Sequence, residues 1–553
     1  MKPSGRPEIL DLLPYLGKWL LLASAVAALA GSASAFFLFA LDWATGTRIA
    51  NRWLIGLLPL EGFVVGWLYL RFGQHVEAGN NLLIDEIHDP KKVIPLRMAP
   101  LVLGGTVISH LFGASVGREG TAVQMGGALA DQFTHVFKLK HEDRRIILMA
   151  GISAGFASVF GTPLAGAIFG LEVLAIGRLR YDALFPCLVA AIVADHVGLL
   201  WGVHHTHYSI GAIPPIALWP LVVMLIAGAV FGLTGKVFAD ATHALSAWVK
   251  KHVRYAPLRP FLGGAVVAAT AWYLGADRYI GLGIPVIVEA FQQPLAPYDW
   301  AAKMAFTVAS LGTGFKGGEV TPLFYIGATL GNALAPLFNM PVALLAGIGF
   351  VAVFAGAANT PIASTLMAME LFGTEIGVYA AIACMVSYLF SGHTGIYRSQ
   401  RVGHAKHRHA PEGIKLGELP AYRKAERERA STESRELCGP SMQNMTALRL
   451  YFPQSARAKP TRFWHHLSAP ALCHHLLKAA RQAGIHQVIV HNVHAGYLPG
   501  KKLSHHHIES TPAHHPLCME LIDAEDRLRH FVKQHAQELR HVHAVLFQCE
   551  LAL

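Results

Sequence analysis

The sequence predicts an all-α membrane protein with many crossings, followed by a smaller α+β domain. Of its 553 residues, 53% are hydrophobic and only 15% are charged, whereas a soluble chain of this size carries about 25% charged residues. Apolar runs fill residues 10–400, and residues 401–553 are polar, basic and rich in histidine. We therefore expect a membrane domain over 1–402, a charged linker over 403–445 and a water-soluble domain over 446–553.

The first span is expected within Trp19–Leu41, which is long enough to cross a bilayer. Lys2 and Arg6 precede it and Ala33-Ser34-Ala35 resembles a signal-peptidase site, but the apolar run continues beyond those small residues. Without cleavage, the positive N-terminus stays inside, and so does the basic stretch Arg398–Arg408. Both termini are therefore expected in the cytoplasm, with an even number of crossings.

Charge and cysteine content exclude several classes of protein. The net charge of +11 lies largely in the linker and at helix ends, where anionic lipid explains it better than nucleic acid. No CxxC pair, nucleophile–base set or metal motif indicates an enzyme. Free thiols are expected for all cysteines, which are Cys187, Cys384, Cys438, Cys473, Cys518 and Cys549.

Glycine and proline break many of the apolar runs, and two stretches of the chain resemble each other. Gly113–Gly127 and Gly312–Gly331 are both glycine-flanked loops that run into a helix. Gly161–Glu172 is likewise paralleled by Asn359–Glu370. Two homologous halves in inverted orientation would explain these pairs, and their broken helices would meet within the membrane.

Three segments predict an anion site: Gly79–Leu83, Gly117–Thr121 and Gly314–Phe324. Glycines expose backbone N–H groups and allow an ion to approach closely. A helix that begins after each loop would point the positive end of its dipole at a common point. Such a site needs no metal, and it suits an ion that must leave again.

These segments resemble the motifs of the CLC chloride channels and transporters over most of residues 10–400. GREGT at 117–121 stands where the family has G-K/R-E-G-P, and GGEVTP at 317–322 stands where it has G-x-F-x-P. Asn80 replaces the usual serine, Thr121 a proline and Val320 a phenylalanine, and these variants resemble the fluoride/proton antiporter branch. The resemblance implies the CLC fold, with two inverted repeats of broken and tilted helices, in a bacterial inner or plasma membrane.

By this resemblance, Glu119 is the gating and proton-coupling glutamate. Its carboxylate would compete with the anion and swing away when it is protonated. The alternative is an ion pair with Arg118, although adjacent residues at a helix start face each other poorly. The anion-binding residues expected beside it are Gly79, Asn80, Asn81, Gly117, Arg118, Gly120, Gly318, Val320, Thr321 and Tyr397.

Several of these residues keep a second interpretation. Asn80 either donates to the anion or caps a broken helix. Thr321 either contacts fluoride or the protonated glutamate, or caps a helix begun by Pro322. Tyr397 either faces the central anion or anchors the chain at the membrane interface beside Arg398. Asn and Thr side chains suit fluoride, which needs several short donors, but they also bind chloride.

The residues indicate the proton route and the oligomeric assembly less directly than they indicate the anion site. The family's cytoplasmic relay would fall at Val173, so Glu172 is expected to be structural, as Glu370 would be. Either Lys316 and Glu319 form an ion pair at a spacing of three residues, or Glu319 joins the proton path. Phe315 and Phe324 are expected to pack. The resemblance implies a homodimer, with a structural Na⁺ on backbone carbonyls near Gly275 and Ile280.

The tail has the pattern of a ferredoxin-like βαββαβ domain. It resembles an uncharacterised bacterial family with a PII-like fold, which implies a regulatory or oligomerising module with an unknown ligand. Residues 401–553 contain nineteen histidines, among them the triplet His505–His507, for which a solvated loop is favoured over a metal site. The predicted elements are strands 447–452, 487–493, 516–522 and 542–551 and helices 469–483 and 524–539.

The residues therefore favour a fluoride/proton antiporter that exports fluoride. A passive chloride or fluoride channel is the main alternative, because gated channels also keep the glutamate. A membrane sensor that signals through the tail is a third possibility, but it would not need a gating glutamate.

Overall fold

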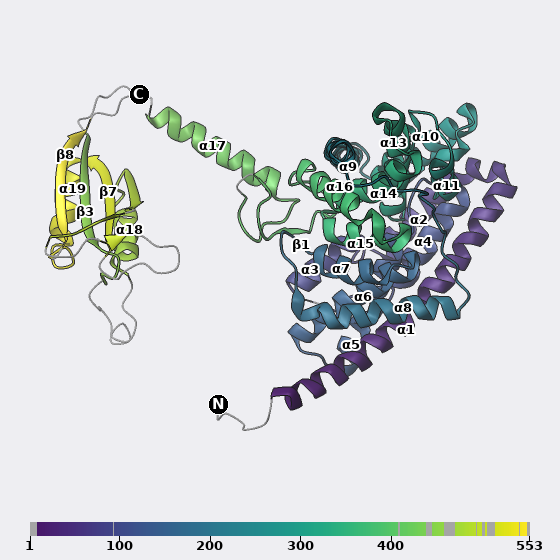
Figure 1. Ribbon diagram of the computed structural model, residues 1–553, viewed down its shortest axis with the longest axis horizontal. Helices are drawn as coiled ribbons and strands as arrows, with labels where there is room; N and C mark the ends of the chain where they lie inside the picture. Colours follow the sequence, from purple (N-terminus) through teal and green to yellow (C-terminus); the bar gives the residue numbers. More distant parts are fainter. Residues whose placement is uncertain are drawn as a thin grey trace. The chain divides into compact units, whose positions relative to one another are not determined.

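The computed structural model describes residues 8–91, 93–407, 410–437, 445–457, 471–493, 495–499, 504–505, 515–540 and 542–549. Contacts divide the chain into two compact units, residues 1–426 and 427–553. The first unit is helical, and the second contains a sheet (Figure 1).

The helical unit consists of two successive series of eight α-helices within the described residues. Short 3₁₀ helices at Arg52–Leu57, Tyr181–Ala183, Asp277–Tyr279 and Thr374–Ile376 link some of them. The first series is α1 (Glu8–Ala50), α2 (Leu58–Phe72), α3 (Asn80–His88), α4 (Met98–Phe112), α5 (Glu119–Phe137), α6 (His141–Phe160), α7 (Pro163–Glu172) and α8 (Leu184–Leu200). The second is α9 (Leu218–His252), α10 (Leu258–Leu274), α11 (Ile284–Gln292), α12 (Asp299–Thr313), α13 (Val320–Phe338), α14 (Val342–Ala358), α15 (Pro361–Phe372) and α16 (Gly377–Phe390).

The two series correspond helix by helix, which confirms the predicted duplication. A long helix opens each series, α3 and α11 have 9 residues each, and α5 and α13 have 19 residues each. Helix α5 packs on α6 as α13 packs on α14, and the counterparts α2 and α10, α5 and α13, and α7 and α15 contact one another. The halves are therefore joined face to face through equivalent helices.

Glycine allows the closest helix crossing in each half. A Cβ atom placed on Gly126 of α5 would lie 2.2 Å from the backbone oxygen of Gly151 on α6. A Cβ atom on Gly327 of α13 would lie 2.0 Å from the backbone oxygen of Gly349 on α14. Small residues let helix backbones approach in this way inside membranes, and here they do so at matching positions.

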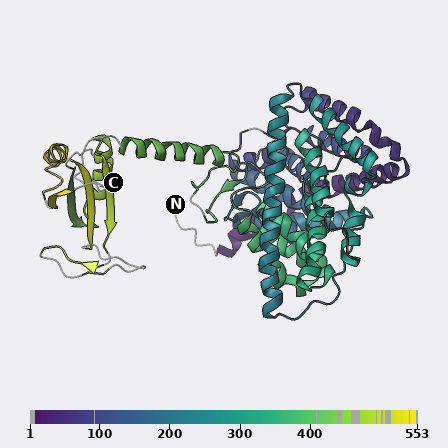
Figure 2. The same ribbon diagram turned by 90° about the horizontal axis from the view of Figure 1, so that it is seen from above.

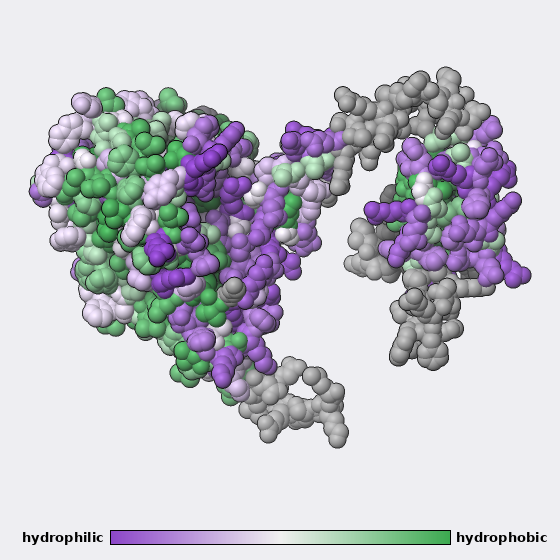
Figure 3. Space-filling model, turned by 180° about the vertical axis from the view of Figure 1, so that it is seen from behind, coloured by the Kyte–Doolittle hydropathy of each residue, from purple (hydrophilic) through white to green (hydrophobic). Residues whose placement is uncertain are grey.

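The described helices include both full-length spans and shorter apolar segments. Five are long and apolar enough to cross a membrane: Leu12–Ala50, Arg52–Phe72, Tyr181–Leu200, Leu218–His252 and Val320–Phe338. The shorter apolar helices include α7, α14 and α15. Hydrophobic side chains cover much of the face of this unit that Figure 3 shows. The prediction of a membrane domain with broken helices is confirmed.

The chain after α16 differs from the expected loose linker. Strand β2 (Arg401–Val402) pairs in parallel with β1 (Ala175–Ile176). Val402, Ala410, Leu416 and Leu419 are buried with Ile176 in one apolar cluster, so these parts of the chain pack on the helical unit. Helix α17 (Leu419–Leu437) follows, and Figure 2 shows it as one unbroken helix.

The second unit has the predicted ferredoxin-like arrangement. Its strands β3 (Met445–Pro453), β4 (Gln487–Asn492), β7 (Pro516–Ala524) and β8 (His543–Cys549) form an antiparallel sheet in the order β4-β7-β3-β8. The helices are α18 (Leu472–Gln482) and α19 (Glu525–Gln534), and a small pair, β5 (Ala495–Gly496) with β6 (Ser504–His505), was not predicted. Helix α19 ends five residues before the predicted end, because residues 535–540 form turns.

The apolar core of this second unit lies between its helices and the sheet. The buried residues are Leu448, Leu450, Phe452, Leu472, Leu476, Ala480, Leu517, Met519, Leu521, Leu528, Phe531 and Leu539. Alternation along β3 and β7 supplies the sheet side of this core.

Candidate anion site

Three helix N-termini meet in the helical unit, and each follows one of the predicted glycine-rich segments. Helix α3 begins at Asn80, α5 at Glu119 and α13 at Val320. The loops before α5 and α13 are paired: Gly117 N–H donates to Gly318 O at 2.6 Å, and Gly318 N–H donates to Gly117 O at 2.8 Å. The positive ends of the helix dipoles are thereby directed to one place.

The Glu119 carboxylate occupies this meeting point. It is 1% exposed, and its Oε2 accepts the N–H of Thr321 at 3.0 Å and that of Arg118 at 3.1 Å. Its Oε1 accepts the hydroxyl of Thr321. An anionic group is thus held by backbone and hydroxyl donors at the starts of two helices, which is the arrangement that binds free anions.

Arg118 contributes both to the carboxylate site and to the space outside it. Its Nε lies 3.6 Å from Glu119 Oε1, within ion-pair range but beyond a hydrogen bond. The pairing that the sequence left as an alternative therefore exists, but it is weaker than the three contacts of the carboxylate with N–H and O–H donors.

Gly120 lies where the side chains of the three segments converge. A Cβ atom at this position would be 3.1 Å from Asn80 Nδ2, 3.1 Å from Gly318 Cα and 3.8 Å from Glu319 Oε2. Any larger residue would narrow this space. Asn80 is the first residue of α3 and the N-cap is Gly79, whose φ of 58° favours glycine. The interpretation of Asn80 as the cap is therefore wrong.

Asn81 ties α3 to the segment that carries Tyr397. Its Oδ1 accepts the N–H of Ser399 at 2.9 Å. Tyr397 is buried, with 4% exposure, and lies within electrostatic range of both Glu319 and Glu119. The interfacial-anchor interpretation of Tyr397 is thus wrong, and Asn81 acquires a positioning role that the sequence did not indicate.

The remaining residues of the third segment are placed as follows. Val320 begins α13 and is buried, and Thr321 lies in its first turn, so Thr321 does not cap a helix begun by Pro322. Lys316 places its ammonium 4.0 Å from the ring centre of Tyr69 instead of pairing with Glu319.

Two aromatic residues of this segment are packed, as predicted. Phe315 is 5% exposed. Phe324 stacks on Phe350, with ring centres 4.0 Å apart.

A cavity of about 780 Å³ leads to this site from one side. Its lining carries four arginines, Arg48, Arg52, Arg118 and Arg278, together with two acidic residues. A smaller space of about 20 Å³ continues from it, lined by Arg118, Glu119, Thr321 and Phe324 among others. The excess of positive charge favours entry of an anion, and the narrow end lies at Glu119.

His205 is a residue of this path that the sequence did not single out. It lines both the larger cavity and the narrow space, and its Nε2 lies 3.6 Å from Asp195 Oδ1. A Cβ atom on Gly161 would meet its ring at 2.5 Å. No motif surrounds it in the sequence, so only the fold reveals its position.

Glu172 and Glu370 join the two halves at equivalent positions. Glu172 accepts the N–H groups of Ile362 and Ala363, at 3.0 and 2.8 Å, where α15 begins. Glu370 accepts those of Leu164 and Ala165, both at 2.8 Å, where α7 begins. The contacts agree with the structural role expected for both residues.

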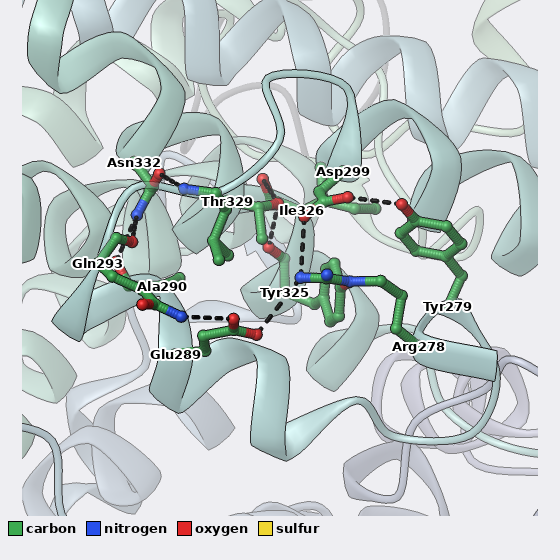
Figure 4. Close-up of polar contacts among 11 residues, drawn as sticks. Arg278, Tyr279, Glu289, Ala290, Gln293, Asp299, Tyr325, Ile326, Thr329 and Asn332 are labelled. Carbon is green, nitrogen blue, oxygen red and sulfur yellow. Dashed lines mark hydrogen bonds and ion pairs between the residues drawn. The ribbon is translucent and has the colours of Figure 1, made fainter. Parts of the chain in front are cut away.

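The loop around the expected sodium site is held by a dense polar network (Figure 4). Arg278 contacts Asp299 at 3.0 Å and Glu289 at 3.4 Å, and the hydroxyl of Tyr279 donates to Asp299 at 2.5 Å. The buried ammonium of Lys303 donates to the carbonyls of Tyr279 and Gly281, which flank Ile280. The loop therefore already directs main-chain oxygens at a cation, and a sodium ion at Gly275 and Ile280 stays a prediction.

Comparison with known proteins places the two units in different families. The profile described as "Voltage gated chloride channel" matches residues 61–392, and the one described as "Uncharacterized ACR" matches residues 447–551. A "Chloride/fluoride channel protein" of Pseudomonas syringae pv. tomato is 68% identical over 79% of this chain and 98% of its own length. An "H(+)/Cl(-) exchange transporter ClcA" of Vibrio parahaemolyticus is 27% identical over 64% of this chain and 81% of its own.

A solved structure agrees with these matches. The crystal structure of a CLC-type fluoride/proton antiporter superposes with a TM-score of 0.68 and 34% identity, over 70% of this chain and 98% of that one. A slow cyanobacterial Cl⁻/H⁺ antiporter shares the fold, with a TM-score of 0.59 at 21% identity over 68% of this chain and 94% of that one. The chain is thus an integral membrane protein that belongs to the voltage gated chloride channel (CLC) family of anion channels and transporters.

Proposed function

We propose that this protein is a fluoride/proton antiporter that exports fluoride from the cytoplasm, with Glu119 as its gate. One observation carries the proposal: the Glu119 carboxyl oxygens accept hydrogen bonds from the Thr321 N–H, the Thr321 hydroxyl and the Arg118 N–H. A free anion could use the same donors once the carboxylate leaves. Protonation would remove the charge that keeps the carboxylate there, so anion entry and proton binding become linked.

The donors around this point support fluoride as the transported anion. Fluoride is small and strongly hydrated, so its water must be replaced by several short hydrogen bonds. The hydroxyl of Thr321, the amide of Asn80 beside Gly120 and the backbone N–H groups can supply them. The solved structure with 34% identity is that of a fluoride/proton antiporter, which supports the same anion, whereas the name of the 68%-identical Pseudomonas syringae relative includes both chloride and fluoride.

The assembly and orientation belong to the same proposal. We expect a homodimer in a bacterial inner membrane, with both termini in the cytoplasm and structural Na⁺ near Gly275 and Ile280. Basic residues support this orientation: Lys2 and Arg6 precede α1, and α9 ends in Lys250, Lys251 and His252. The cavity near the end of α1, which contains Arg48 and Arg52, would then open to the outside.

Ion flux from proteoliposomes tests the function. Purified full-length protein is placed in vesicles loaded with fluoride or chloride, and anion efflux and internal pH are recorded together. The proposal predicts rapid fluoride efflux, much slower chloride efflux, and proton uptake driven by the fluoride gradient against a pH gradient. Equal chloride flux without proton movement would contradict it and support a passive anion channel.

A further inference from the structure

We propose that the C-terminal unit binds one divalent transition-metal ion through His475, His535 and Glu538. These three residues lie in the unit 427–553, and a metal site there does not depend on which anion the membrane unit carries. Sequence spacing does not reveal this group, because sixty residues separate its first histidine from its second. The fold brings them together.

The three side chains already stand at distances close to those of a metal site. His475 Nε2 lies 3.1 Å from one oxygen of Glu538, and His535 Nδ1 lies 2.7 Å from the other. One ligand atom from each residue can be chosen so that all three lie within 4.8 Å of one another. Two ligands of one tetrahedral zinc ion are about 3.4 Å apart, given metal–ligand distances near 2.1 Å. Small side-chain rotations therefore suffice to surround an ion.

The core of the domain fixes where these ligands stand. His475 precedes Leu476 in α18, and Glu538 precedes Leu539, and both leucines are buried in the same apolar cluster. The N–H of His535 donates to the carbonyl of Phe531, and the two rings lie 4.7 Å apart. The early end of α19 at Gln534 turns the chain so that His535 and Glu538 both face α18. A pre-formed ligand set loses little entropy when a metal binds.

The ligand types identify the class of metal. Two imidazoles and one carboxylate suit Zn²⁺ and neighbouring divalent ions such as Co²⁺, whereas Mg²⁺ and Ca²⁺ prefer oxygen. The side chains of His475, His535 and Glu538 are 33%, 16% and 18% exposed, so water can reach the site as a fourth ligand. The alternative is a purely hydrogen-bonded trio, in which the Glu538 carboxylate accepts a hydrogen bond from each imidazole.

Metal binding to the full-length protein in detergent distinguishes these two possibilities. Zn²⁺ binding is measured by titration calorimetry, and Co²⁺ binding by its visible absorption, after removal of metal with a chelator. We expect one tight ion per chain. His475→Ala, His535→Ala and Glu538→Gln should each weaken its binding by about tenfold or more. The matched control is His474→Ala, because His474 is the exposed neighbour on the same helix and should keep wild-type affinity.

Thermal unfolding guards against variants that fail to fold. Zn²⁺ should raise the unfolding temperature of the second unit in the wild type and in His474→Ala, but not in Glu538→Gln, which keeps the size of the side chain. Equal metal affinity in the wild type and in all three ligand variants would overturn the proposal. It would also be overturned if alanines at His505 to His507, and not at His475, abolished the tight binding.

Discussion

The two halves of the membrane unit have the same arrangement of helices but differ in the side chains at the starts of their central helices. At the contact between α7 and α15, both halves place a glutamate, Glu172 or Glu370, on two N–H groups of the other half. At the starts of α5 and α13 the symmetry is broken, because Glu119 stands at the first position of one and Val320 at that of the other.

This difference distinguishes the contacts that stabilise both halves from the contacts that form the candidate site. The symmetric carboxylates hold helix ends that must be satisfied in both halves. The asymmetric position supplies one carboxylate from the first half and the donors for it from the second, through Thr321. The single carboxylate at this point therefore depends on a difference between the two halves at these positions.

The largest expected effect lies at the symmetric glycine crossings. Gly327→Ala would place a Cβ atom 2.0 Å from the oxygen of Gly349, and Gly126→Ala one 2.2 Å from that of Gly151. Because a backbone oxygen cannot rotate away from the added Cβ atom as a side chain could, each substitution should destabilise the protein by about 3 kcal/mol. Thermal unfolding in detergent measures this loss. Gly104→Ala, with no atom within 4 Å of its added Cβ, is the control and should be neutral or stabilising. Unequal losses of stability at the two crossings would show that the two halves are not equivalent there.

The symmetric glutamates should give the next largest effect. Glu172→Ala removes the acceptor of two N–H groups at the start of α15 and should cost about 1.5–3 kcal/mol. Glu370→Ala should cost less, because Glu370 is only partly buried whereas Glu172 is 6% exposed. Unfolding midpoints of both variants test the order. A larger loss from Glu370→Ala would mean that burial does not govern these contacts.

The smallest loss of stability is expected at Thr321, because Glu119 keeps two backbone N–H donors without its hydroxyl, and the change should appear mainly in transport. Thr321→Val keeps the shape of the side chain and removes one of the three donors to Glu119. One hydrogen bond to a charged group is worth about 1.5–3 kcal/mol. Without this donor, fluoride flux should fall about tenfold or more. Thr329→Val on the same helix removes a hydroxyl that bonds only its own helix, and its flux should stay near wild type. Equal fluoride flux from both variants would contradict the assignment of Thr321 to the site.

The sequence predicted the parts of this molecule that local patterns encode. The paired motifs predicted the two halves, and Glu172 and Glu370 were expected to be equivalent because Gly161–Glu172 and Asn359–Glu370 read alike. The tail strands followed from alternation, and the observed sheet order is that of the predicted ferredoxin-like fold.

Contacts between distant segments could not be predicted in this way. The bond from Ser399 N–H to Asn81 spans 318 positions, and the ring of His205 reaches the anion path from a loop without a motif. The packing of Ala410, Leu416 and Leu419 on the helical unit depends on partners such as Ile176, which a charge-rich stretch does not indicate. The starts of α3 and α13 also differed by one or two residues from expectation, and this changed the interpretation of Asn80 and Thr321.

The same substitution in two carboxylates tests whether Glu119 is the gate. Glu119 and Glu370 both accept backbone N–H groups where a helix begins, but only Glu119 lies at the end of the charged cavity. Fluoride efflux and proton movement are recorded in proteoliposomes for Glu119→Gln and Glu370→Gln. We expect Glu119→Gln to abolish fluoride-driven proton transport and Glu370→Gln to keep it. Proton coupling that survives in Glu119→Gln would contradict the assignment of Glu119 as the gate.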